Sequence, residues 1–175
     1  MQEIYSLPGL RLFAAVVPFA LALIGSVIAN FPVSFTGGML PTPLFGIMPV
    51  CFWGLMRPDL MPAWAALLAG FAEDLLSGGP PGIWAASFVA AYVFIDRQRD
   101  ALAGLAGFGA IIGFTAALLV AMTSAFGIIA VYYWRLPPTA PLIAAFAANV
   151  LWYVPALWLM NRVQHNLVGP LRSEF

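Results

Sequence analysis

The chain alternates between long apolar runs and short polar breaks, and this pattern predicts its elements. A helix that crosses a bilayer needs about 20 apolar residues. Six runs approach or exceed this length, at residues 12–29, 43–56, 60–76, 80–95, 101–130 and 141–160. The second run is short, and the fifth is longer than one straight span requires, so it would tilt, project from the membrane or break near Gly127. The pattern predicts an all-α integral membrane protein with six transmembrane helices in one domain over residues 1–175.

Composition supports this class. The 175 residues are 63% hydrophobic and 8% charged, whereas a soluble domain carries roughly 25% charged residues. The net charge is zero and no basic run occurs, so nothing indicates binding to nucleic acid. Cys51 is the single cysteine, which excludes an internal disulfide and a thiolate metal cluster.

The arginines predict the orientation of the helices. Cytoplasmic loops of membrane proteins carry an excess of Lys and Arg. If both termini are cytoplasmic, only Arg135 lies outside. The other six then lie inside: Arg11, Arg57, Arg97, Arg99, Arg162 and Arg172. The sequence therefore predicts a multi-pass protein with both termini in the cytoplasm.

An acidic turn stands out at residues 70–82, GFAEDLLSGGPPG. Glu73 and Asp74 lie at the end of an apolar run with no arginine beside them. A charge in such a run costs about 2.5–3.5 kcal/mol at mid-membrane, which makes the pair a candidate site. One acid would cap backbone amides of the turn, such as those of residues 77–79, or of the next helix, while the other reaches headgroup water. Alternatively, one acid faces the bundle interior as a proton site, ligand contact or partner contact.

The fifth run carries small residues at every fourth position. Side chains four apart form one ridge on a helix, and small ones let a second helix approach closely. Packing within the chain is the preferred interpretation, and a seam for a partner's helix is the alternative. The ridge consists of Gly109, Gly113, Ala117, Ala121 and Ala125.

Two further features have structural interpretations. Asn149 lies midway along the sixth run and needs a hydrogen-bond partner, which Tyr153 or Thr115 could supply. Six aromatic residues suit an interfacial belt: Trp53, Trp64, Tyr132, Tyr133, Trp134 and Trp158.

Signatures of enzymes are missing from the sequence. It contains no nucleophile elbow, no paired histidines for zinc and no phosphate-binding glycine loop. We therefore expect no catalytic residue, no cofactor and no metal site.

The acidic turn extends into a recognisable pattern. Gly70 is followed by the stretch from Asp74 to Gly78, which reads Asp-Leu-Leu-Ser-Gly, and then by Pro81-Gly82. A fourth run that ends near Arg97 and Arg99 completes it. This pattern resembles the rod-shape-determining MreD family over roughly residues 57–99, although Gly79-Pro80 departs slightly from it. The resemblance marks Asp74, Gly78, Pro81, Gly82, Arg97 and Arg99 as structural or partner-binding residues. Glu73 is a candidate of the same kind because of its place in the apolar run.

The resemblance implies a non-catalytic scaffold in the bacterial inner membrane. Such proteins support rod shape and lateral peptidoglycan synthesis as part of the elongasome. They associate with MreC, and indirectly with the MreB filament, a SEDS glycosyltransferase and a penicillin-binding transpeptidase. Their fold is similar to the substrate-binding subunits of energy-coupling-factor transporters, so the alternative function is a small-molecule-binding subunit of a transporter. Self-association as a homo-oligomer stays open.

Overall fold

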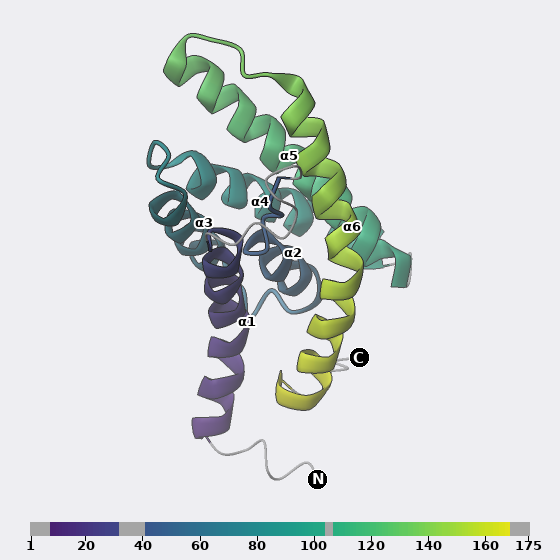
Figure 1. The fold of residues 1–175 in the computed structure, drawn as a ribbon. Helices are drawn as coiled ribbons and strands as arrows, with labels where there is room; N and C mark the ends of the chain where they lie inside the picture. The colour runs from purple at the N-terminus through teal and green to yellow at the C-terminus, as the bar shows by residue number, and fades with distance from the viewer. Residues whose placement is uncertain (1–7, 32–40, 104–106, 169–175) are drawn as a thin grey trace.

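The computed structural model describes residues 8–31, 41–103 and 107–168. These residues form helices and no strand, so the predicted all-helical class is confirmed (Figure 1). The elements are α1 (Pro8–Ala29), α2 (Ile47–Met56), α3 (Ala63–Ser77), α4 (Ile83–Ala103), α5 (Gly107–Tyr133), α6 (Thr139–Val163) and the π-helical turn η2 (Gln164–Val168).

Several helix boundaries differ from the prediction. α4 continues to Ala103, so the polar stretch 96–100, expected beyond the end of the fourth helix, is helical. Arginine and glutamine are good helix formers, so this helix does not end where its apolar run ends. α5 runs unbroken through Gly127, which excludes a break there.

The shortest helix lies at the centre of the molecule. α2 contacts each of the other five α-helices, and its residues from Ile47 to Leu55 are buried. Its 10 residues extend about 15 Å, half of a hydrocarbon core about 30 Å thick. The second apolar run is therefore short because it forms the core of the bundle.

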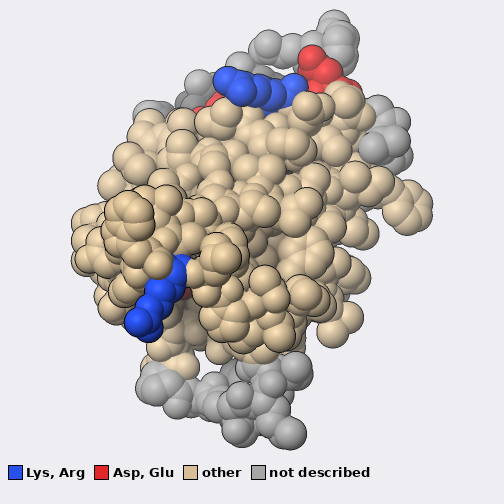
Figure 2. Space-filling view, turned by 90° about the horizontal axis from the view of Figure 1, so that it is seen from above, with Lys and Arg blue, Asp and Glu red and all other residues tan. Residues whose placement is uncertain are grey.

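Within the residues that the structure describes, two helices are long and apolar enough to cross a membrane. They are Phe108–Tyr133 and Thr139–Leu167. Large apolar side chains are exposed on both helices, including Val131 at 71% and Leu151 at 73% relative exposure. Figure 2 shows a face that is almost wholly uncharged, with the visible arginine and acidic side chains near its edges. The molecule thus carries apolar residues on its surface as well as in its core.

Close backbone contacts hold α1 against the bundle. At Gly25, an added Cβ atom would lie 2.7 Å from the carbonyl carbon of Phe45. At Gly46, an added Cβ atom would lie 2.2 Å from the Ser26 hydroxyl. α1 also contacts η2, and the start of α1 and the end of α6 lie at the same end of the molecule in Figure 1.

Candidate functional site

Asp74 joins α3 to the start of α4. Its Oδ2 accepts hydrogen bonds from the amides of Gly82 at 2.8 Å and Ala85 at 3.1 Å. Its Oδ1 accepts one from the amide of Trp84 at 2.8 Å. The first amides of a helix lack partners within that helix, and a carboxylate satisfies them while favouring the positive end of the helix dipole. Asp74 is therefore the N-terminal cap of α4, supplied by the preceding helix.

The amides that Asp74 binds were only partly predicted. A cap on the turn or on the next helix was expected, with residues 77–79 as candidate donors, but the donors lie in residues 82–85. Gly78 ends α3 in a left-handed conformation, with φ of 67°, and Gly82 has φ of 100°. These two positions favour glycine, and the turn that they form, which includes Pro81, returns the chain over Asp74.

Gly70 lies one helical turn before Asp74 and belongs to the same contact. A Cβ atom at Gly70 would lie 2.5 Å from the carbonyl oxygen of Trp84 and 2.7 Å from the Cα of Ala85. No side chain fits at such distances, because both neighbours are backbone atoms. The glycine and the aspartate of the motif thus act together: one lets the α4 backbone approach, and the other binds its amides.

Glu73 lies in a different environment from its neighbour. Its Oε1 accepts a hydrogen bond from Nδ2 of Asn30 at 2.7 Å, and this amide also donates to the carbonyl oxygen of Ser26 at 2.9 Å. Its Oε2 and the Ser26 hydroxyl are both buried. Glu73 is 2% exposed, so the prediction that one acid reaches headgroup water is wrong. Instead, Glu73 connects α3 to the end of α1.

The small-residue ridge on α5 is buried. All five of its residues, Gly109 to Ala125 at every fourth position, are buried, and α5 contacts α4 more extensively than any other helix. A Cβ atom at Gly113 would lie 2.9 Å from a methyl group of Leu102 in α4. The helices of this chain therefore cover the ridge, as the preferred interpretation of packing within the chain requires.

The two arginines at the end of α4 have different surroundings. Arg99 forms an ion pair with Asp96, one turn earlier on the same helix. Arg97 is exposed and lines a surface groove together with apolar residues of α3, α4 and α5. In the part of the chain that the structure describes, no ion pair involves Arg97.

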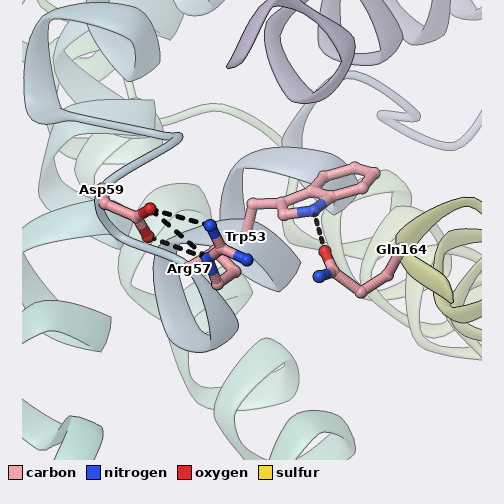
Figure 3. A network of polar contacts seen from close by, with 4 residues as sticks. All are labelled: Trp53, Arg57, Asp59 and Gln164. Carbon is pink, nitrogen blue, oxygen red and sulfur yellow. Dashed lines mark hydrogen bonds and ion pairs between the residues drawn. The ribbon is translucent and has the colours of Figure 1, made fainter. Parts of the chain in front are cut away.

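One buried and one exposed polar contact have no counterpart among the sequence predictions. Figure 3 shows Nε1 of Trp53 donating to Oε1 of Gln164 at 2.8 Å, which fastens η2 to α2. Trp53 is fully buried, so its predicted place in an interfacial belt is wrong, whereas Trp64 and Trp134 are exposed. In the same view Arg57 pairs with Asp59 at 3.0 Å in the turn after α2.

The partner of Asn149 also differs from the prediction. Its Oδ1 accepts from the amide of Leu44 at 2.8 Å, and its Nδ2 donates to the carbonyl oxygen of Ala145 at 2.8 Å. Tyr153 instead stacks on Phe114, with ring centroids 3.7 Å apart. The buried asparagine itself was the available signal, but a backbone donor 105 residues away leaves no pattern in the sequence.

Possible metal ligands do not cluster in the described residues. Among them, no group of three or more His, Cys, Asp or Glu side chains could hold a metal ion. No family model, curated protein or solved structure matches the chain.

Proposed function

We propose that this chain is a non-catalytic scaffold of the bacterial cell-elongation machinery, similar to MreD proteins, in the inner membrane. The observation that carries the proposal is that the motif from Gly70 to Gly82 connects helices α3 and α4. Both oxygens of Asp74 accept backbone amides, and Gly70 brings the α4 backbone against α3. The most distinctive stretch of the sequence therefore acts as a structural joint between two helices.

Four observations support a multi-pass membrane protein with both termini in the cytoplasm. Two helices of the described part of the chain are long enough to span, large apolar side chains are exposed, and six of the seven arginines fall on one side in this orientation. In addition, α1 begins and α6 ends at the same end of the molecule. The proposed arrangement is a six-helix membrane domain, similar to the energy-coupling-factor subunits, with α2 enclosed by the other helices.

The outer surface of α6 supports binding of a partner within the membrane. Trp152, Trp158 and Leu159 are exposed, and α6 packs mainly against α5. The connections from α2 to α3, from α3 to α4 and from α5 to α6 are short, so in this part of the chain helix faces provide most of the surface available to an MreC-like protein. Contacts with the MreB filament and the cell-wall synthases would be indirect.

Affinity purification in mild detergent tests the scaffold function. The tagged chain is expressed in a rod-shaped bacterium that lacks its own copy, and the co-purifying chains are identified. The wild type should recover an MreC-like protein and preserve rod shape. Asp74→Ala should insert in the membrane, recover less of the partner and produce rounded cells, whereas the control Asp59→Ala should behave as the wild type. Normal shape and normal partner recovery with Asp74→Ala would contradict the proposal.

A second function has one observation in its favour. An apolar cleft of about 410 Å³ lies between α5 and α6. Its lining consists of Leu119, Met122, Thr123, Phe126, Thr139, Leu142, Ile143 and Phe146. This cleft suits a small apolar ligand and would belong to a capture subunit of a transporter. On that alternative, Thr123→Trp, which fills the cleft, abolishes binding of a small ligand while cell shape stays intact.

A further inference from the structure

A groove runs along the outer face of α4 and ends at Arg97. Its volume is about 680 Å³. Leu67 of α3 and Val120 of α5 flank it. Its remaining lining residues lie on α4: Ala86, Val89, Ala90, Val93, Phe94, Arg97 and Gln98. Most of the α4 positions are three or four residues apart, which places them on one face of the helix.

The polar residues of the groove are confined to one end. From Ala86 to Phe94 the α4 face is apolar, and Arg97 and Gln98 follow in the next turn. Eleven residues separate Ala86 from Arg97, which corresponds to about 16 Å along the helix. This length matches one leaflet of a bilayer, half of a hydrocarbon core about 30 Å thick.

Arg97 has a free guanidinium group at this end. Asp96 binds Arg99, and within the described residues Arg97 takes part in no ion pair. A guanidinium group binds a phosphate through two parallel hydrogen bonds, and its charge favours anionic headgroups. In the proposed orientation the end of α4 is cytoplasmic, so the headgroup would belong to the inner leaflet.

We propose that this groove binds one acyl chain of an anionic phospholipid from the cytoplasmic leaflet, with its phosphate on Arg97 and Gln98. This inference rests on the proposed membrane location. A partner's helix fits less well, because a helix of the same length and about 10 Å diameter occupies on the order of 1,200 Å³, more than the groove holds. Ala86 and Ala90 have small side chains, which leave room along the groove for a flexible acyl chain.

The test uses the full chain, purified in detergent and exchanged into nanodiscs or analysed by native mass spectrometry. Binding of phosphatidylglycerol is compared with that of phosphatidylcholine. The wild type should prefer phosphatidylglycerol. Arg97→Gln should reduce its affinity by about fivefold or more, the factor expected for one arginine near an anionic surface. The matched control Arg135→Gln, in the loop between α5 and α6, should change nothing.

A second variant tests the apolar part of the site. Ala90→Phe fills the groove without touching the charge, so it should reduce retention of both lipids. Inorganic phosphate, added alone, should not displace the lipid. Displacement of the lipid by phosphate would show that the site binds anions without an acyl chain, and this would overturn the proposal. Retention by Arg97→Gln equal to that of Arg135→Gln, or unchanged retention by Ala90→Phe, would also overturn it.

The outcome is independent of the scaffold test. Recovery of an MreC-like partner without a lipid preference would refute the groove and leave the scaffold intact. A lipid preference without partner recovery would refute the scaffold and leave the groove intact.

Discussion

Replacing Asp74 by alanine should destabilise the protein more than any substitution of an exposed charge. Three backbone amides, at 2.8, 2.8 and 3.1 Å, lose their acceptor. Hydrogen bonds to a charged group contribute about 1.5–3 kcal/mol each, but bonds that share one acceptor group do not add fully. Asp74 is 2% exposed, and each buried amide that loses its acceptor costs about 1–3 kcal/mol. Because the three losses share one acceptor group and add only in part, we expect Asp74→Ala to lower the free energy of unfolding by about 3–5 kcal/mol.

Asparagine at this position should have an intermediate effect. Its single oxygen can replace Oδ2 and keep the amides of Gly82 and Ala85, but its NH2 group then faces the amide of Trp84. One bond is lost and two donors meet, which we expect to cost about 1.5–3 kcal/mol.

Unfolding in detergent micelles of fixed composition, followed by the helical circular dichroism signal, measures these differences. The control is Asp59→Ala, which removes an exposed ion pair with Arg57 and should cost about 0–1 kcal/mol. If Asp74→Ala unfolds at the same midpoint as Asp59→Ala, the capping role assigned to Asp74 is refuted.

Three further predictions concern other parts of the chain. In a Cys51→Ser background, a cysteine at Gly38 should react with an impermeant reagent from outside, and one at Gln98 only after permeabilisation; the reverse pattern would refute the orientation. Gly113→Leu should cost about 1–3 kcal/mol by overpacking against α4, and wild-type melting would show that α4 yields freely there. Glu73→Gln should match the wild type in stability, because its amide can donate to the Ser26 hydroxyl; a loss equal to that of Asp74→Asn would show that the carboxyl group is required.

The apolar runs predicted that helices form, because burial of apolar residues depends on composition and length. They did not predict where the helices end. α4 extends past its apolar run through Arg97 and Arg99, and α2 is short because neighbouring helices enclose it. Helix boundaries depend on caps and on packing partners, which a run of apolar letters does not contain.

The cost of charge in an apolar run predicts that Glu73 and Asp74 have specific partners, and both acids are buried and hydrogen-bonded. The sequence does not predict which groups form hydrogen bonds with the two acids. Whether Asp74 binds the amides of residues 77–79 or 82–85 depends on how far the turn folds back, which the left-handed conformations at Gly78 and Gly82 decide. The contact of Glu73 with Asn30 spans 43 residues, so only the tertiary arrangement of α1 and α3 creates it.

For the proposed membrane location, the contact between Asp74 and the start of α4 also has a consequence for insertion. The carboxylate and its donors are separated by only 8 to 11 residues, so the contact can form as soon as α4 leaves the ribosome. Entering the bilayer before then would expose both an unpaired charge and unpaired amides to hydrocarbon. Helices α3 and α4 are thus expected to insert together as one hairpin. During biogenesis, the hydrogen bonds from the α4 amides to Asp74 would hold the two helices of this hairpin together.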